Sequence, residues 1–466
     1  MHFTILLFFF SLTLGSCKKT LQVNFPQGAL PDSKVLGNDS STLDVVTGVY
    51  YSMSGPSPID GSNSLYLELG LAADELEEDY PDPDLLAIYA DEFSPAQTYF
   101  WSYLYTQIYA CNVVINSRSA AQLVTAGPLR RQAIGEAFFL RAFMLFYATN
   151  LYGDIPIPTT TDYRTNNVLT RSPRTAVYAR IIEDLEASRG LLGSAYLDGK
   201  GRATNDRGRA NKWAAMALLA RVHLYAGNWV AARAAADSVI ADGAQYTLLT
   251  DLNQVFLANS PEAIWQILPV IRQVNTYAAD VFILSRAPDY QHNVAMSQFL
   301  VKDFELGDLR RSDWVGQLKV PVADTTASYY YPYKYKVPFS LPAKEYLMIM
   351  RLAEQYLIRA EARTRLGDLM GAASDLNQLR SRAGLAGTPA ATQAELLLAI
   401  SHERRVELFT EFGDRWFDLK RTGSLDSVMQ AVAPRKGGVW HGYDSILPIP
   451  TSEILLNPHL TQNPGY

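Results

Sequence analysis

Three carboxylates recur at four-residue steps near the end of the chain: Glu403, Glu407 and Glu411. On a helix this spacing puts them on one face. Glycoside hydrolysis uses two carboxylates that face a sugar from opposite sides of a cleft, roughly 5–9.5 Å apart. Carboxylates on one stripe do not bracket a substrate in this way, and Arg404 and Arg405 lie within reach in the sequence. The pattern therefore predicts ion pairs or a solvated face rather than catalysis.

The rest of the sequence carries no pattern that is typical of an enzyme. Its six histidines are scattered, and His402-Glu403 lacks the second histidine of a zinc-protease motif. The sequence has no Gly-x-Ser-x-Gly elbow, P-loop or dinucleotide fingerprint. The net charge of −6 comes without a basic cluster. Nucleic acid is therefore excluded as a partner, because phosphates need a concentrated positive surface. We expect a binding protein and no enzyme.

The most acidic stretch runs from Ala73 to Asp84 (ADELEEDYPDPD). Carboxylates at this density could hold Ca²⁺ through their oxygen atoms. The stretch lacks the ligand spacing and the glycine of an EF-hand loop, which favours a solvated acidic loop. We therefore expect no cofactor, with a loop calcium ion as the weaker alternative.

The N-terminus has the composition of an exported lipoprotein. Residues 3–14 are almost wholly apolar, which suits a signal-peptide core and is too short to span a bilayer. The next residues, Leu14-Gly15-Ser16-Cys17, resemble a bacterial lipobox, whose cysteine is acylated after cleavage. We predict a signal peptide over residues 1–16, lipid on Cys17 and a polar tether over residues 17–40. An ordinary secretory signal with a chance cysteine is the alternative. Cys111 is then expected to be a buried apolar residue.

Two later segments share one pattern, which predicts a scaffold of helical hairpins. The shared spacing pairs Ala220, Gly227, Asn228 and Ala232 with Ala360, Gly367, Asp368 and Ala372. Around each glycine, apolar residues recur at three- and four-residue steps, the period of a buried helix face. One hairpin cannot bury its own apolar face, so further repeats are needed. We predict helical repeats over residues 99–242 and 345–425, including a helix, turn and helix over 347–385.

The segments between the repeats differ from them in amino-acid composition. Residues 55–98 and 245–345 are rich in turn-forming and aromatic residues and carry only short apolar runs. This composition indicates an irregular, loop-rich lobe with short strands. Residues 329–335 predict a strand that packs against helices, and residues 440–466 predict an extended tail. Four tryptophans lie on helix or strand patterns and are expected in the core: Trp101, Trp213, Trp265 and Trp416.

Several motifs resemble those of one family. Residues 403–421 (ERRVELFTEFGDRWFDLKR) are similar to the signature helix of the SusD/RagB family, outer-membrane lipoproteins of the Bacteroidetes. The end of the chain, with LPIP at 447–450 and NPGY at 463–466, resembles the ending of that family. Residues 150–156 (NLYGDIP) and 351–362 do so as well. Together with the lipobox, the resemblance covers nearly the whole chain.

This resemblance implies a mainly α fold, with about four tetratricopeptide-like hairpins and an irregular lobe in one domain over residues 41–466. It implies a surface-exposed protein that is anchored by lipid in the outer membrane. Such a protein captures an oligosaccharide or polysaccharide and passes it to a SusC-like TonB-dependent transporter, without catalysis. One alternative is the same architecture with peptides or another nutrient as cargo. Another is a generic tetratricopeptide adaptor, against which the lipobox and the C-terminal motifs argue.

A glycan site combines exposed aromatic rings with polar side chains, because sugars offer flat C–H faces and hydroxyl groups. Such residues are expected on loops that a rigid scaffold holds. Two loop regions fit, residues 74–93 and 277–314. The candidate ligand residues are Asp74, Tyr80, Tyr89, Phe93, Tyr277, Tyr290, Asn293 and Trp314. Asp74 is included because the resemblance implies an early acidic residue there. For each aromatic residue, core packing is as good an interpretation as ligand contact.

Overall fold

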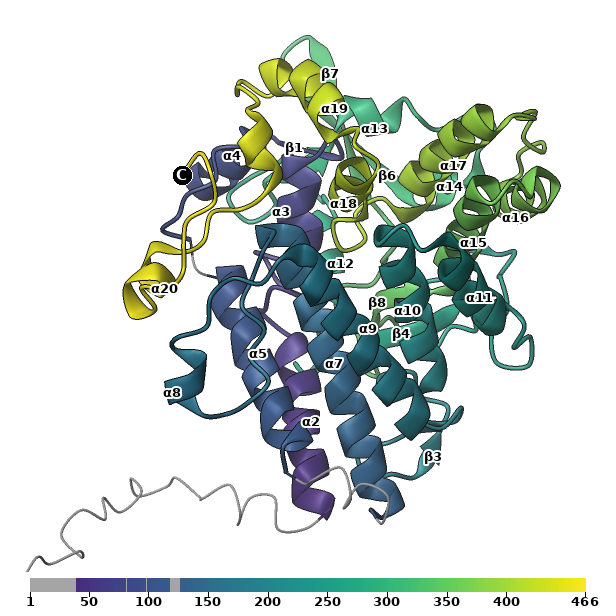
Figure 1. Ribbon diagram of the computed structural model, residues 1–466. Coiled ribbons are helices and arrows are strands. Elements are labelled where there is room, and N and C mark those ends of the chain that lie inside the picture. Colours follow the sequence, from purple (N-terminus) through teal and green to yellow (C-terminus); the bar gives the residue numbers. More distant parts are fainter. Residues whose placement is uncertain (1–38, 81, 98, 118–125) are drawn as a thin grey trace, which may run out of the picture.

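The computed structural model describes residues 39–80, 82–97, 99–117 and 126–466. The predicted signal peptide, Cys17 and most of the predicted tether lie outside these residues. The described chain is mainly α-helical with a few short strands (Figure 1), which confirms the predicted fold class. None of its helices is both long and apolar enough to cross a membrane.

The scaffold is an array of helices in which each member packs on the next (Figure 1). The array comprises α2 (Asp39–Met53), α5 (Tyr99–Ile115), α7 (Pro128–Tyr152), α9 (Arg174–Leu191), α10 (Lys212–Tyr225), α11 (Trp229–Ile240), α15 (Leu352–Arg365), α16 (Leu369–Arg382) and α17 (Gln393–Leu408). Helix α7 carries buried residues around its whole circumference. It therefore lies inside the array, with α2, α5 and α9 packed on it.

The two hairpins predicted from their shared spacing are present. Helices α10 and α11 are joined at Gly227, and α15 and α16 at Gly367. The two glycines have φ angles of +74° and +85°, which residues with a Cβ rarely adopt. Asp368 caps α16, because its carboxylate accepts a hydrogen bond from the Gly371 backbone N–H at 3.0 Å. Helices α11 and α15 also pack together, so the two hairpins form one continuous scaffold.

The irregular segments carry short elements. Those of residues 55–98 and 245–345 are α3 (Leu65–Ala72), β1 (Leu76–Glu78), α4 (Pro83–Tyr89), η1 (Leu252–Gln254), β4 (Ala263–Ile267), α12 (Tyr277–Phe282), β5 (Val294–Met296), α13 (Gln298–Val301), α14 (Leu309–Asp313), β6 (Val315–Val322) and β7 (Thr325–Pro332). Connections within the helical array add α8 (Tyr163–Asn166), β2 (Tyr196–Leu197) and β3 (Ala203–Thr204). Strands β6 and β7 form a hairpin, so the predicted strand at residues 329–335 lies partly in β7.

Residues 347–351 form a strand, β8 (Leu347–Arg351), which corrects the prediction that they begin a helix. This strand pairs antiparallel with β4, and all residues of both strands are buried. A short apolar run buried on both faces suits a strand as well as a helix, so periodicity alone could not decide between them. Trp265 of β4 packs edge-on against Phe139 and Phe143 of α7, with ring centroids 4.8 and 5.1 Å away.

The predicted signature helix at residues 403–421 is interrupted. Helix α17 ends at Leu408 and α18 (Asp414–Arg421) begins after a turn. Thr410, Phe412 and Gly413 in this turn have positive φ angles of 53°, 49° and 69°. A Cβ added at Gly413 would lie 2.3 Å from Leu69 Cδ1, so this close approach to α3 requires glycine. Glu411 therefore lies in the turn and not on the helix face of Glu403 and Glu407.

The predicted extended tail, residues 440–466, contains two short helices, η3 (Gly442–Ser445) and α20 (Thr451–Leu456). It is preceded by α19 (Leu425–Val432) and η2 (Ala433–Arg435). The core prediction is confirmed for Trp101, Trp265 and Trp416, and Trp213 is only partly buried. Cys111 is a buried free thiol, as expected.

Candidate ligand-binding site

A two-stranded ribbon joins the two loop regions that the sequence singles out. Strand β1 pairs antiparallel with β5, with Leu76 opposite Met296 and Glu78 opposite Val294. Beyond Glu78, the Asp79 N–H donates to the Asn293 carbonyl at 2.8 Å. At the other end, the Ser297 hydroxyl donates to the Asp74 carbonyl at 2.5 Å, across 223 residues of sequence. The ribbon therefore fixes the two loops relative to each other.

Tyr290 projects from a tight turn at one end of this ribbon. The Asp289 carboxylate accepts hydrogen bonds from the backbone N–H groups of Gln291 and His292, at 2.9 and 3.1 Å. Arg286 pairs with Asp289 and also donates to Gln291 Oε1 at 3.1 Å. The Tyr290 side chain is 73% exposed. A turn held in this way presents the ring to solvent at little conformational cost.

Tyr80 follows the partner strand at the same end of the ribbon, and its side chain is 41% exposed. The next described residue, Asp82, caps α4 by accepting from the Asp84 N–H at 3.0 Å. The Asp82 N–H donates in turn to the Glu78 carboxylate. The backbone is thus anchored on both sides of Tyr80, and two exposed tyrosines emerge from the same end of one ribbon.

Asp74 is buried at the base of the ribbon and is bound by two arginines. The Arg415 Nε donates to Asp74 Oδ1 at 2.8 Å, and the Arg405 Nη2 lies 2.8 Å from Asp74 Oδ2. Burial alone would raise the pKa of Asp74, but hydrogen bonding and charge from Arg415, with the charge of Arg405, hold it below its usual value. These contacts correct the view of Asp74 as an accessible ligand residue, because both carboxylate oxygens already have charged partners.

Trp314 is wholly buried, which corrects its interpretation as an exposed platform. Its indole N–H donates to the Leu252 carbonyl at 3.0 Å. The Lys334 ammonium lies 5.2 Å from its ring centroid, and Phe256 packs edge-on at 5.5 Å. The aromatic ring therefore stabilises the interior, the alternative that the sequence left open for each aromatic candidate.

The remaining candidate ligand residues are buried to different degrees. Phe93 is 9% exposed and packs edge-on against Trp416, with ring centroids 6.1 Å apart. Asn293 is 8% exposed, and its backbone carbonyl extends the ribbon. Tyr89 and Tyr277 are half-buried. The exposed aromatic candidates are thus Tyr80 and Tyr290.

The carboxylates of the ribbon have no cationic partner in the part of the chain that the structure describes. Burial, assisted by the charge of Asp79, raises the pKa of Glu77 to about 7. Burial likewise raises the pKa of Asp79 and of Glu78. At neutral pH Glu77 is therefore a mixture of acid and carboxylate, which can donate to a hydroxyl group as well as accept from one.

A cavity of about 370 Å³ adjoins the segment that carries Tyr80. It lies between α3, α4, the start of α5 and the C-terminal tail, and Asp84 and Ile88 of α4 line it. Its other walls combine rings with amides: Phe93, Phe100, Tyr99, Tyr152, Asn63 and Gln97. Pockets for small ligands run from roughly 300 to 1,000 Å³, so the cavity is large enough for one.

Glu68 also lines this cavity, and sequence reasoning missed it. Burial, with a further contribution from the charge of Asp84, raises the pKa of Glu68 to about 8. The side chain is therefore largely uncharged at neutral pH and can donate a hydrogen bond. No local pattern marks Glu68, Asn63 or Gln97 in the sequence, because the α3 segment and the segment before α5 meet only in the folded structure.

The carboxylates near the C-terminus are buried in a network of ion pairs. Glu407 contacts Arg310 at 3.0 Å and Arg351 at 2.5 Å, and also pairs with Arg382. Burial alone would raise the pKa of Glu407, but the charges of these three arginines hold it well below its usual value. Glu403 pairs with Arg310 at 2.6 Å. The predicted ion pairs are present.

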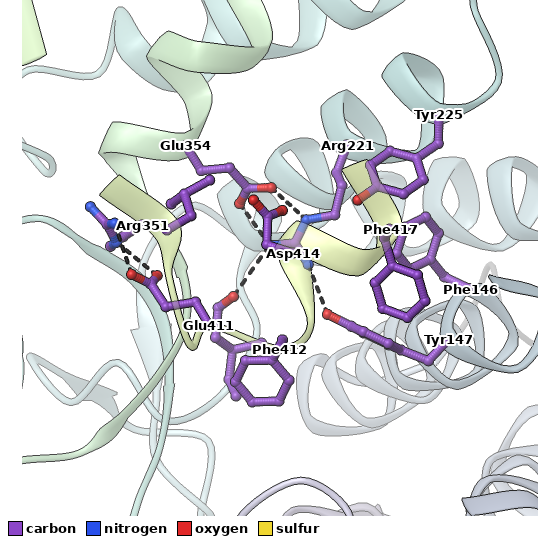
Figure 2. Close-up of a pocket in the computed structure, with 12 residues that line it drawn as sticks. Phe146, Tyr147, Arg221, Tyr225, Arg351, Glu354, Glu411, Phe412, Asp414 and Phe417 are labelled. Atoms are coloured by element: carbon purple, nitrogen blue, oxygen red, sulfur yellow. Dashed lines mark hydrogen bonds and ion pairs between the residues drawn. The ribbon is translucent and has the colours of Figure 1, made fainter. Parts of the chain in front are cut away.

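A small cavity beside this network illustrates how tightly the interior is filled (Figure 2). Figure 2 shows Arg351 paired with Glu411 at 2.9 Å, and Arg221 bonded to Glu354 at 2.6 Å. Arg221 also donates to the Tyr147 hydroxyl at 3.2 Å. The space between them is about 20 Å³, roughly that of one water molecule. It is too small for a sugar ring.

Within the described residues, no group of three or more His, Cys, Asp or Glu side chains has a geometry that could hold a metal ion. The weaker alternative of a loop calcium ion at residues 73–84 therefore gains no geometric support. In that stretch Asp74 faces arginines, Glu77 and Glu78 belong to β1, and Asp82 caps a helix.

Comparison with known proteins identifies the family. Residues 312–466 match the model of the SusD family, and residues 84–224 match a model described as "Starch-binding associating with outer membrane". The chain belongs to the SusD family. The SusD-like protein P25 of Formosa agariphila is 24% identical over 97% of both chains. The starch-binding protein SusD of Bacteroides thetaiotaomicron is 36% identical over 25% of this chain and 21% of its own.

The SusD-like fold is also found among solved structures. A laminarin-binding SusD-like protein has a TM-score of 0.73 and 24% identity, over 92% of this chain and 100% of its own. This match shows a shared fold. The resemblance carried by the sequence motifs is thus confirmed at the level of family and fold.

Proposed function

We propose that this SusD-family protein captures an oligosaccharide or polysaccharide at the cell surface. The observation that carries the proposal is the β1–β5 ribbon, which holds the exposed rings of Tyr80 and Tyr290 at one end. Each ring can stack on the C–H face of a sugar unit, and the rigid turn around Tyr290 limits the entropy lost on binding. A family member that binds starch and a structural neighbour that binds laminarin support this assignment.

The ribbon carboxylates supply hydrogen bonds to the same ligand. Glu77 and Glu78 lie on β1 and Asp79 follows it, and none of the three has a cationic partner among the described residues. Because Glu78 already accepts from the Asp82 N–H, Glu77 and Asp79 are the carboxylates that would bond hydroxyl groups. The neighbouring cavity, with Glu68 and the rings of Tyr99 and Phe100, would receive a terminal or branching unit of the glycan.

Capture proceeds without hydrolysis in this proposal. Glu403, Glu407 and Glu411 are committed to arginine and lysine partners, and none is available to protonate a leaving group or attack a sugar. The protein would be anchored in the outer membrane by lipid on Cys17 and would deliver its ligand to a SusC-like TonB-dependent transporter. The family model described as associating with the outer membrane supports that location.

Calorimetric titration tests the proposed capture. The body of the protein, residues 18–466, is titrated with a panel of polysaccharides and peptide digests, and reducing ends are assayed in parallel. Saturable heat with one glycan class and no new reducing ends is expected. Saturable heat with peptides alone would show that the ligand is a peptide. New reducing ends would show hydrolysis and overturn the assignment as a binding protein.

Anchoring and delivery need a separate test in cells. Cys17→Ser should release the protein from the membrane fraction, while a Cys111→Ser variant, which changes the buried thiol, should leave it there. Co-purification of the tagged protein with a TonB-dependent transporter is expected. A Cys17→Ser variant that stays in the membrane fraction would contradict lipid anchoring.

A further inference from the structure

Another cavity, of about 240 Å³, lies beside α5 and is lined in part by α8 and α20. Three aromatic residues of α5 line it, one for each helical turn: Trp101, Tyr105 and Tyr109. The rings of Trp101 and Tyr105 stack with centroids 4.6 Å apart. Tyr109 is 50% exposed. The cavity thus has an aromatic wall that reaches the surface.

A second wall of the cavity, formed by the segment after α7, is fixed to α5 by side-chain hydrogen bonds. The Tyr105 hydroxyl donates to the Pro156 carbonyl at 2.9 Å, and the Asn112 amide donates to the Pro158 carbonyl at 2.9 Å. These bonds hold the extended segment after α7 along α5. The cavity is therefore built before any ligand arrives, which lowers the entropy cost of binding.

Glu453, in the first turn of α20, places a carboxyl group in this cavity. The Trp101 side chain donates a hydrogen bond to it, and burial raises its pKa. No lysine or arginine pairs with Glu453 among the described residues. Arg171, which also belongs to this region, instead donates to the carbonyls of Asp154 and Thr461, at 2.7 and 2.9 Å. The cavity therefore holds an acidic group without a counter-charge.

The rim of the cavity is apolar and exposed. Leu456 lines the cavity and is 74% exposed, and Leu455 beside it is 79% exposed. Tyr163 of α8 and Val168, which are close in sequence to the lining residues 166, 167 and 169, are 69% and 56% exposed. Helices α8 and α20 lie on the same side of the molecule in Figure 1. Exposed apolar residues grouped around a polar cavity are typical of a protein-binding surface.

We propose that this cavity binds a basic side chain, most suitably arginine, of a partner polypeptide whose flanking apolar residues cover Leu455, Leu456 and Val168. A guanidinium group fits here because it can pair with the Glu453 carboxylate and lie against the aromatic wall of α5 at the same time. A neutral sugar would leave the carboxylate without a counter-charge. A small free cation would leave the apolar rim exposed. The inference does not depend on the proposed glycan site.

Three blocked probes test the proposal by calorimetry on the full-length protein in detergent. They are N-acetyl-Leu-Arg-Leu-amide, the same peptide with neutral citrulline in place of arginine, and N-acetyl-arginine amide. The arginine peptide should bind at least tenfold more tightly than the citrulline peptide, because only arginine supplies the counter-charge. It should also bind more tightly than N-acetyl-arginine amide, because only the peptide covers the leucine rim.

Matched variants locate the binding. Glu453→Gln keeps the shape of the side chain and its hydrogen bond with Trp101. It should weaken binding of the arginine peptide about tenfold. Leu456→Ser should weaken binding of the arginine peptide and leave the affinity for N-acetyl-arginine amide unchanged. Tyr290→Ala should change the affinity for neither probe, which distinguishes this surface from the proposed glycan site. Thermal melting checks that each variant is folded.

Equal binding of the arginine and citrulline peptides to the unaltered protein would overturn the proposal without any variant. A saccharide that binds this cavity and is indifferent to Glu453→Gln would also overturn it, and would make the cavity a glycan site.

Discussion

Carboxylates occupy two regions of this protein and have opposite surroundings there. Around α17, Glu407 is buried among Arg310, Arg351 and Arg382, and its pKa is held well below the usual value. On the β1–β5 ribbon, Glu77 has no cationic partner among the described residues, and its pKa is raised to about 7. The same residue type therefore stabilises the fold in one place and remains available to a ligand in the other. The counter-charge distinguishes the two roles.

The largest effect is expected from Glu407→Ala. The substitution leaves three buried arginines without their shared partner, and breaking a buried ion pair in this way costs about 3–5 kcal/mol. The free energy of unfolding, measured in urea, should fall by that amount. The control is Glu77→Gln, which removes a carboxylate with no cationic partner and should not lower the free energy of unfolding, because burial already disfavours the charged form of this group. Similar losses for both variants would break the distinction between the regions.

A smaller loss of stability is expected from Asp74→Asn. Asp74 belongs to the acidic stretch of the ribbon by sequence, but Arg405 and Arg415 make it structural. Losing charge-assisted hydrogen bonds to the two arginines should lower the free energy of unfolding by about 2 kcal/mol. Glycan affinity of the folded variant should stay the same. A loss of glycan affinity with an unchanged free energy of unfolding would show that Asp74 contributes to ligand binding.

Tyr290→Ala should affect binding and leave stability unchanged. Removing a ring that stacks on one sugar unit should weaken glycan affinity about tenfold, or about 1.4 kcal/mol. Because the side chain is 73% exposed, the melting temperature should not move. Tyr51→Ala is the matched control, since Tyr51 is 63% exposed on α2, away from the ribbon. An equal loss from both variants would show a nonspecific effect of surface tyrosines.

The smallest effect concerns the pH dependence that Glu77 confers. Its pKa in the folded protein is about 7, above the ordinary value of 4.5 that applies when the chain unfolds. Between these values the folded state binds more protons, so this group's contribution to stability is present at low pH and lost as pH rises toward 7. Glu77→Gln should therefore match the unaltered protein at pH 4 and exceed it in stability at pH 8. A constant difference across this range would contradict the raised pKa.

The helical scaffold could be predicted because its signals are local. Gly227 and Gly367 mark the two hairpins directly, since the turn needs a positive φ angle. The turn at Thr410–Gly413 escaped prediction because only the close approach of Leu69 on α3 explains the glycine there. Residues 347–351 were ambiguous because a buried apolar run suits a strand or a helix.

The candidate site was predictable by region but not by residue. Aromatic residues among polar ones identified both loops, and the ribbon brings these loops together. The sequence could not separate Tyr290, at 73% exposure, from the wholly buried Trp314, because burial depends on what other segments supply. Glu68 was missed for the same reason, since its cavity forms between separate elements.

The central claim is tested most directly by the double variant Tyr80→Ala/Tyr290→Ala in calorimetric titration with the glycan that the unaltered protein binds. If the two rings at the end of the ribbon form the platform, binding should fall below detection while urea unfolding stays unchanged. Retention of the original affinity by a folded double variant would contradict the account and place the ligand elsewhere on the molecule.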